Sequence, residues 1–501
     1  MASPMEDHLF ARLQHKTDAA ALQRQQDALS SRQSAQDRRS QDRLAELVQD
    51  NASLPVTIRS VRVLHAHRTR RGFLERAVGP VLSASGPDGC TLEDALAAVG
   101  AAADRLDRFG IFKAPVAVFL DRPDPATADS SPTDVDVYLA AHERGRYTVK
   151  TGTEAGASEA DAYVHAELRN LFGGAETLNA HGSLGTRTRS AYSLAFDTPV
   201  ASRPDLRWQL HGFASSALKP WAAHELRQRG ATTRLLWRSA AGHEHALTYA
   251  GVWRQLTALA PHASPTVRAD AGDSFKSSLT HSWTNDRRDN PLLPSRGYLL
   301  KTVAELAGLG ALAGDVSFLK TEAESHLALP VGATGITLTA GLRAGLLYPL
   351  ARNASTINDR FQLGGPNSVR GFRLGGLGPH DGADAVGGDL FAAGGASLLL
   401  PVPRVGKDTP LRLQAFINGG RLLALKPAKS EDGTLAADAR ESLKQAFRDL
   451  KEELPSAAAG VGLVYAHPLA RFEINFSLPL VMRKEEQGRK GLSFGVGIEF
   501  L

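Results

Sequence analysis

The chain ends in Gly491-Leu-Ser-Phe-Gly-Val-Gly-Ile-Glu-Phe-Leu501, and this stretch is the clearest guide to the fold. Every second residue from Leu492 onward is apolar, and the residues between them are Ser, Gly and Glu. A period of two with one apolar face predicts a half-buried strand of an antiparallel sheet. The same alternation recurs in residues 472–478, 411–417 and 336–346. The end of the chain therefore predicts a series of half-buried strands.

About sixteen segments of this kind run from residue 147 to the end of the chain. Their expected starts lie near residues 147, 161, 177, 190, 206, 228, 244, 274, 296, 318, 336, 390, 411, 457, 471 and 492. An even number of strands of roughly ten residues, with no helical layer to cover a second face, predicts an all-β transmembrane barrel. We expect about 16 antiparallel strands over residues 145–501, with the apolar set facing lipid and the polar set facing the lumen. Because closure removes exposed edges, the first strand should pair with the last.

The composition excludes several other classes of protein. The 501 residues carry a net charge of +5, which does not suggest a nucleic-acid-binding protein, and the single Cys90 excludes an intramolecular disulfide or a cysteine-cluster metal site. No uncharged stretch reaches the roughly 18 residues of a membrane helix. His243-Glu-His245 lacks a third metal ligand, and residues 308–314 lack the spacing of a dinucleotide loop. We therefore expect no metal, no cofactor and no enzymatic activity.

The first 141 residues predict a tail and one small domain. Residues 1–50 are rich in Gln, Arg, Asp and Ala, which favours a polar tail that is weakly helical or disordered, and they show no pattern of a secretory signal or a matrix presequence. Residues 52–141 predict a compact α/β domain. Its expected elements are a strand at 56–63, a short helix at 72–81, a helix from a capping box at Thr91-Leu-Glu-Asp94 to Gly110, and strands at 115–120 and 135–140.

Two insertions interrupt the series of strands. A long loop covers residues 358–388, and residues 435–454 are helical in composition. The loop contains Gly364-Gly365 and then Val369-Arg370-Gly371-Phe372.

These motifs resemble those of the outer-membrane-protein assembly superfamily. The tetrapeptide at 369–372 is similar to the Val/Ile-Arg-Gly-Phe motif in the sixth loop of its barrels, and residues 388–389 and 396–398 are similar to the strand after that loop. Leu106-Asp-Arg-Phe-Gly-Ile-Phe112 is similar to the end of the second helix in the polypeptide-transport-associated (POTRA) domain of the superfamily. The resemblance covers residues 55–501. With one accessory domain and no signal peptide, the chain is most similar to the central barrel subunits of the mitochondrial sorting and assembly machinery.

The resemblance implies a function. We expect insertion and folding of β-barrel precursor proteins in the mitochondrial outer membrane, without ATP or metal, and with the N-terminal domain in the intermembrane space. The implied partners are precursor proteins, accessory subunits of the sorting and assembly machinery and outer-membrane lipid, with no nucleic acid. The alternative is a passive or polypeptide-secretion pore of the same superfamily. An open lumen would favour the pore, and a lumen plugged by the long loop would favour the assembly factor.

The expected site of action is a lateral seam between the first and last strands. An opened seam exposes backbone donors and acceptors that are costly to leave unpaired in lipid, and a client strand can pair with them. Glycines in the last strand lack side chains to pack, which should ease its release. Residues 489–496 also fit the sorting pattern of mitochondrial barrel precursors. The candidate residues are Tyr147, Val149, Thr151 and Thr153 on the first strand and Gly491, Phe494, Gly495, Val496, Gly497 and Ile498 on the last.

Arg370 is the candidate latch that holds the long loop inside the barrel. A guanidinium in the lumen needs a partner, because an unpaired buried charge is costly. Bacterial relatives carry acidic latch partners on the two strands after the loop, but the matching positions here are Leu399 and Asn418. The possible partners are therefore Asn418 itself, Glu473, Glu322, Glu324 or backbone carbonyls.

Overall fold

The computed structural model divides the chain into two units. One contains the residues up to Glu143 apart from Arg68–Arg70, and the other contains Arg68–Arg70 and Arg144–Leu501. The structure describes residues 31–33, 36, 39–40, 42–43, 45–84, 90–123, 131, 133–155, 160–332, 334–350, 355–403, 409–425, 435–468 and 470–497. Most of the expected polar tail and Ile498 of the expected last strand lie outside the described residues.

The first unit is a four-stranded sheet with two helices. Its elements are β1 (Pro55–Leu64), α3 (Arg71–Ala84), β2 (Cys90–Thr91), α4 (Leu92–Arg108), β3 (Ala117–Asp121) and β4 (Asp134–Ala140). The sheet has the order β2-β1-β4-β3, with β1 parallel to β4. At the expected capping box, the Thr91 side chain accepts a hydrogen bond from Asp94 N, 3.2 Å away. The helix expected at 72–81 continues through Pro80 to Ala84, because an internal proline removes one hydrogen bond without having to end the helix.

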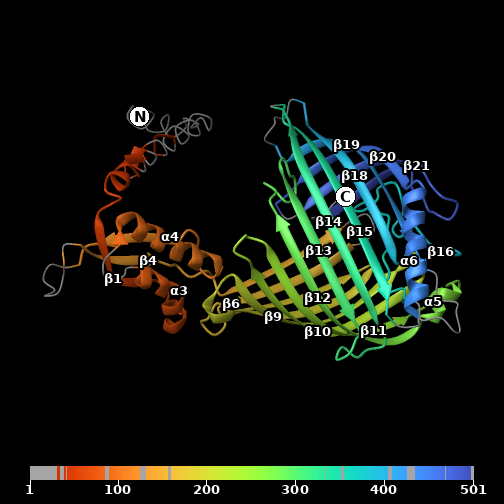
Figure 1. The fold of residues 1–501 in the computed structure, drawn as a ribbon, viewed down its shortest axis with the longest axis horizontal. Helices are drawn as coiled ribbons and strands as arrows, with labels where there is room; N and C mark the ends of the chain where they lie inside the picture. The colour runs from red at the N-terminus through yellow and green to blue at the C-terminus, as the bar shows by residue number, and fades with distance from the viewer. Residues whose placement is uncertain are drawn as a thin grey trace, which may run out of the picture. The chain divides into compact units, whose positions relative to one another are not determined.

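The second unit is built on one sheet of 16 strands. The strands are β5 (Tyr147–Ala155), β6 (Ala160–Arg169), β7 (Thr177–Gly185), β8 (Thr188–Pro199), β9 (Leu206–Lys219), β10 (His224–Arg238), β11 (Glu244–Thr257), β12 (Gly272–Asp286), β13 (Gly297–Ala307), β14 (Phe318–Val331), β15 (Ile336–Pro349), β18 (Leu390–Pro401), β19 (Leu411–Leu423), β20 (Ser456–Ala466), β21 (Arg471–Val481) and β22 (Gly491–Gly497). Each pairs antiparallel with its neighbours in chain order, and the sheet curves into a wall (Figure 1). The expected antiparallel sheet is confirmed. The largest difference between an expected and an observed strand start is at β10, which begins at His224 rather than near residue 228.

Short elements lie in the connections between these strands. They are η1 (Val200–Ser202), η2 (Pro220–Ala222), α5 (Pro265–Ala269), the small hairpin β16 (His380–Asp381) and β17 (Asp384–Ala385), and α6 (Leu435–Glu452). No helix in the described part of the chain is both long and apolar enough to cross a bilayer.

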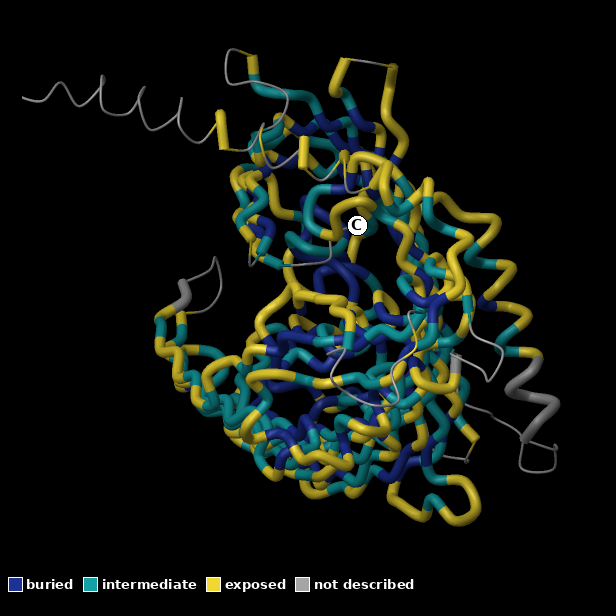
Figure 2. Tube along the Cα trace, turned by 90° about the vertical axis from the view of Figure 1, so that its left-hand side faces the viewer, coloured by how far each residue is buried: buried dark blue, intermediate teal, exposed yellow. Residues whose placement is uncertain are grey.

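The two faces of the sheet have the polarity expected of a membrane barrel. On β21, the apolar Phe472, Ile474 and Phe476 are 41%, 39% and 47% exposed, whereas Glu473 and Asn475 are fully buried. Figure 2 shows the same alternation of exposed and less exposed residues along other strands. A water-soluble sheet buries its apolar face, so this reversed arrangement fits a wall that faces lipid on its outer side.

The expected pairing of the first strand with the last is not present. β5 and β22 are the two ends of the sheet, and no register joins them among the residues that the structure describes. Gly491, at the start of β22, has φ of +120°. The three glycines of β22, Gly491, Gly495 and Gly497, offer no side chains to pack against a neighbour, so pairing along this edge is weak.

Candidate functional site

Arg370 lies at the centre of the site and is almost completely buried. Its Nε donates to Glu473 Oε2 at 3.0 Å, and its Nη2 donates to Oε1 at 3.2 Å. Arg370 comes from the long loop, whereas Glu473 is an inward-facing residue of β21. This two-point ion pair joins the tip of the loop to the inner wall of the barrel near the last strand.

The single carboxylate of Glu473 forms ion pairs with two guanidinium groups. Arg471 Nη2 lies 2.6 Å from Glu473 Oε1, and Asn475 Nδ2 donates to Oε2 at 2.7 Å. The Arg370 guanidinium also lies over the ring of Phe416, 4.8 Å from its centroid. Because the two cations share one anion in a buried place, Glu473 is the residue on which this cluster depends.

The other possible latch partners do not contact Arg370. Glu322 lies 3.6 Å from Lys320, and Glu324 lies 3.9 Å from Lys301. Asn418 is buried, but neither of its side-chain amide atoms has a hydrogen-bond partner among the described residues, and Leu399 is part of the buried core. Of the four candidates, the structure brings only Glu473 to Arg370. Sequence reasoning missed Arg471 and Phe416, although both occupy inward-facing positions in strands that it had identified.

The glycines of the loop motif have conformations and surroundings that exclude a side chain. Gly371 has φ of +85°, and a Cβ built on it would lie 2.7 Å from the Cβ of Ala458. Gly364 and Gly365 have φ of +107° and +119°. Such values are readily adopted only by glycine. The neighbouring Val369 and Phe372 are buried in a core cluster that the loop shares with the strands; its members are Ala307, Val316, Phe318, Leu347, Phe361, Leu363, Val369, Phe372, Leu377, Phe391, Ala393, Leu422 and Ala458.

A second anchor, which sequence reasoning missed, holds the start of the loop. Arg254 Nη1 donates to Asp359 Oδ1 at 2.6 Å, Lys276 Nζ lies 3.4 Å from the same oxygen, and Lys320 Nζ donates to the Asp359 carbonyl at 3.0 Å. Burial alone would raise the pKa of Asp359, but the charges of Arg254 and Lys276 and the hydrogen bonds from Arg254 and Thr356 lower it below its usual range.

The tip of the loop also pairs with the turn at residues 482–490, which leads into β22. Arg373 N donates to Gln487 O at 3.0 Å, Gln487 N to Gly376 O at 2.8 Å, and Arg489 N to Gly371 O at 2.7 Å. The Asn367 side chain donates to the carbonyl of Val496, 2.9 Å away. The loop therefore reaches from the inner wall to the last strand itself.

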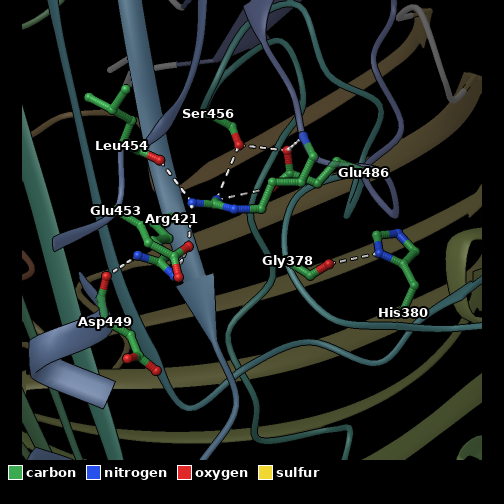
Figure 3. A network of polar contacts seen from close by, with 9 residues as sticks. Gly378, His380, Arg421, Asp449, Glu453, Leu454, Ser456 and Glu486 are labelled. Carbon is green, nitrogen blue, oxygen red and sulfur yellow. Dashed lines mark hydrogen bonds and ion pairs between the residues drawn. The ribbon is translucent and has the colours of Figure 1, made fainter. Parts of the chain in front are cut away.

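The same turn is held from its other side by residues that follow α6, since Arg483 Nη2 lies 3.3 Å from Glu453 Oε2 and donates to the Leu454 carbonyl at 2.8 Å. Figure 3 shows Arg421 of β19 between Asp449 and Glu453, and Ser456 beside Glu486. Arg421 Nη2 donates to Glu453 Oε2 at 2.7 Å, and its Nη1 donates to the Asp449 carbonyl. Ser456 Oγ donates to Glu486 Oε2 at 2.6 Å. Arg421 shares its face with the lipid-facing Ile417, so α6 supplies the partners that let an arginine lie there.

The structure does not bring the two sets of seam residues together. On β5, Tyr147 and Val149 are 72% and 67% exposed, and Thr151 and Thr153 are also exposed. On β22, Phe494 and Val496 are exposed while Gly495 is buried. Both strands therefore present an edge that no described strand covers.

Comparison with known proteins identifies the family. Residues 170–500 match the model of the Omp85 superfamily domain.

The chain belongs to the Omp85 superfamily.

The match to Omp85 includes the loop motif, Glu473 and β22, and it begins just after β5 and β6. The chain is 37% identical over 461 residues to the SAM50-like protein of Schizosaccharomyces pombe, covering 91% of this chain and 94% of that protein. It is 31% identical over 456 residues to the sorting and assembly machinery component 50 homolog of Homo sapiens, covering 88% and 91%. The expected resemblance is thus confirmed.

A solved structure supports the Omp85 fold. BamA from Haemophilus ducreyi, lacking POTRA domains 1–3, superimposes with a TM-score of 0.69 at 16% identity, covering 88% of this chain and 84% of that one. Such a similarity at low identity concerns the fold alone. The first unit, with its two helices and four-stranded sheet, is consistent with one POTRA domain.

Proposed function

We propose that this chain inserts and folds β-barrel precursor proteins in the mitochondrial outer membrane, and that it acts by strand addition at the seam between β5 and β22. The relatives named for the sorting and assembly machinery, similar over about nine-tenths of the chain, support the membrane and the activity. The observation that carries the mechanism is that no register joins β5 and β22, the two ends of the sheet, among the described residues.

The chemistry of the seam favours strand addition. A backbone group left unpaired in hydrocarbon costs several kcal/mol, so an open edge in the membrane has a strong tendency to acquire a strand. A client strand supplies donors and acceptors for either edge without any cofactor. The glycines of β22 leave few side chains to pack along its edge, so its pairing with β5 can be exchanged for pairing with a client.

The contents of the lumen favour this function over a pore. Val369 is fully buried and Phe372 is 3% exposed, and both pack in the core cluster between the loop and the inner wall. Arg370 and Asp359 fix the loop at two further points. A conducting pore would require this loop to leave the wall, whereas an assembly factor that acts at its seam does not.

The proposal includes the orientation and the partners. With 16 strands, the start of β5 and the end of β22 lie on the same side of the membrane, which we assign to the intermembrane space together with the N-terminal domain. Precursor proteins, accessory subunits of the sorting and assembly machinery and outer-membrane lipid are the proposed partners. Protease added to intact mitochondria should spare residues 1–145, and cleavage there before the outer membrane is ruptured would contradict the orientation.

A disulfide lock tests the seam. In a Cys90→Ser background, cysteine pairs placed between β5 and β22 should close the seam on oxidation and block client insertion while the barrel stays folded. Several pairs are needed, because bridging requires Cα separations of about 4.4–6.8 Å. Cysteines at Phe476 and Leu492, which face each other across the bonded β21–β22 pair, provide the control and should leave insertion unchanged. Normal insertion through a verified, fully oxidised seam would reject strand addition and favour the pore.

A further inference from the structure

A cavity of about 500 Å³ lies at the edge of β22, between that strand and the tip of the loop. Its apolar wall comes from Phe372, Leu374 and Phe494. The cavity is also lined by three cationic residues, which are Arg373 of the loop and Arg489 and Lys490 of the turn before β22. Neither the loop motif nor the latch uses these cationic side chains.

The three cations are exposed, and none forms an ion pair with a described residue. Arg483, on the same turn, differs in this respect. Its guanidinium lies 3.3 Å from Glu453 and 3.8 Å from Glu486. The turn therefore contains one cation with acidic partners of its own and two that line the cavity without them. A concave site with three unneutralised cations is suited to an anionic group.

The backbone that carries the cations is fixed. Glu486 accepts hydrogen bonds from Ser456 Oγ at 2.6 Å, as seen in Figure 3, and from Arg483 N at 2.9 Å. The hydrogen bonds that join Gln487 and Arg489 to the loop hold the turn on the other side. A site built on such a constrained turn loses little conformational freedom when it binds an anion.

The cavity lies where the next strand of the barrel would pair. Ser493 pairs with the inward-facing Asn475, while Phe494 pairs with the outward-facing Ile474. Since both residues line the cavity, it spans the edge of β22. A strand that pairs antiparallel with β22 runs toward the turn, so its carboxyl-terminal end arrives at the cations.

The first strand of the chain carries acids at that end. β5 is antiparallel to β22 by its place in the 16-stranded sheet, so the carboxyl-terminal end of β5 lies on the same side as the turn at 482–490. Glu154 is the second-last residue of β5, and its register partner on β6 is Asp161. Asp161 has no ion pair in the described part of the chain. The two ends of the sheet thus carry opposite charges at the same rim.

We propose that Arg373, Arg489 and Lys490 form a carboxylate-binding pocket, and that its occupant is the acidic end of the β5–β6 hairpin, Glu154 and Asp161, when the seam closes. The inference deepens the proposed function and rests on it, because it assigns the ion pairs that close the seam and set its register. It also makes closure sensitive to salt, since charges at an exposed rim are screened.

The test measures closure without any client. Full-length protein with Cys90→Ser is purified in vesicles of neutral phosphatidylcholine, and disulfide yield is measured for several cysteine pairs between β5 and β22. Reversing one side, by Glu154→Lys with Asp161→Lys or by Arg489→Glu with Lys490→Glu, should lower the yield about threefold at 0.1 M salt, and 1 M salt should reduce this difference. Combining both reversals should restore the yield. Lys484→Glu, an exposed cation of the same turn that does not line the cavity, is the matched control and should change nothing.

The outcomes separate the pocket from the proposed function. Unchanged yields after either reversal, or no recovery in the combined variant, would overturn the pocket. So would an effect of the cation reversal that arises only in vesicles with anionic phospholipid, because the pocket would then hold a lipid phosphate. If a reversal variant fails to fold, as judged by heat-modifiability on a gel, Glu154→Gln with Asp161→Asn replaces it and should give a smaller loss. If the disulfide lock blocks client insertion but charge reversal has no effect on the disulfide yield, strand addition at the seam is supported and the carboxylate-binding pocket is rejected.

Discussion

Removal of Glu473 should release the loop far more readily than removal of Arg370. In Glu473→Ala, the buried guanidiniums of Arg370 and Arg471 both lose the carboxylate that they share. In Arg370→Ala, Glu473 keeps Arg471 at 2.6 Å and Asn475 at 2.7 Å, so the carboxylate is not left unpaired. The two substitutions break the same latch, but only the first removes the carboxylate that two buried guanidiniums share.

The expected magnitudes follow from this difference. Removing one partner of a buried ion pair costs about 3–5 kcal/mol, which we expect for Glu473→Ala. Loss of the charge-assisted hydrogen bonds in Arg370→Ala should cost about 1.5–3 kcal/mol, because the remaining partner stays satisfied. A difference of about 2 kcal/mol corresponds to roughly a 30-fold difference in the population of the opened loop.

Native-state proteolysis measures that population. The purified barrel is treated with a non-specific protease, and cleavage within residues 355–389 is followed under conditions where opening and closing are fast compared with cleavage. Glu324→Ala is the control, because Glu324 is a lumen glutamate that lies 3.9 Å from Lys301 and pairs with neither loop anchor among the described residues, so it should have little effect. Equal cleavage of Arg370→Ala and Glu473→Ala, or a Glu473→Gln variant as protected as the wild type, would refute the argument.

Three further outcomes are expected. Gly371→Ala should destabilise the loop by about 1–3 kcal/mol, because its φ of +85° and a contact at 2.7 Å leave no room for a Cβ, and it should raise cleavage in the same assay. Phe494→Arg should cost about 2–4 kcal/mol if the residue lies near the bilayer centre, whereas Ser493→Arg on the lumen side should cost less, and equal losses of folded barrel on denaturant titration would contradict the lipid-facing assignment. Folding lowers the pKa of Asp359, so its contribution to the stability of the loop is present above the ordinary pKa of about 3.9 and is lost as the pH falls through the lower folded pKa. Protection of the loop from protease should therefore fall in acid. Asp359→Asn should be cleaved faster at neutral pH, and its cleavage should no longer depend on pH in this range.

The strands could be predicted because their signal is local. Alternation along β21 or β15 depends only on which face meets lipid, so the residues of each strand carry the information for that strand. The capping box at Thr91 is local in the same way and gave the start of α4 correctly. The end of α3 was harder to predict, because whether the helix continues past Pro80 depends on packing in the small domain rather than on the proline alone.

The polar contacts of the site were harder to predict because they join residues far apart in the chain. Arg370 and Glu473 are 103 positions apart, and Arg254 and Asp359 are 105 apart. A partner of Arg370 must occupy an inward-facing position of a strand, which leaves a short set of candidates. Glu322, Glu324 and Glu473 all meet this condition. Choosing among them requires the depth of the loop in the lumen, which the packing of Val369 and Phe372 determines.

Alternation could not predict whether the two ends of the sheet pair with each other. Alternation describes the two faces of a strand, but pairing takes place at its edges, and the edge of a strand is backbone whatever its sequence. Periodicity therefore predicted that β5 and β22 exist and could not predict whether they pair. What distinguishes these edges is the weakness of their side-chain packing, through the glycines of β22, and the charges at their shared rim, Glu154 and Asp161 on one side and Arg489 and Lys490 on the other. If weak packing leaves the seam free to open and opposite charges bring it back into register, then the balance between the two sets how readily a client strand enters.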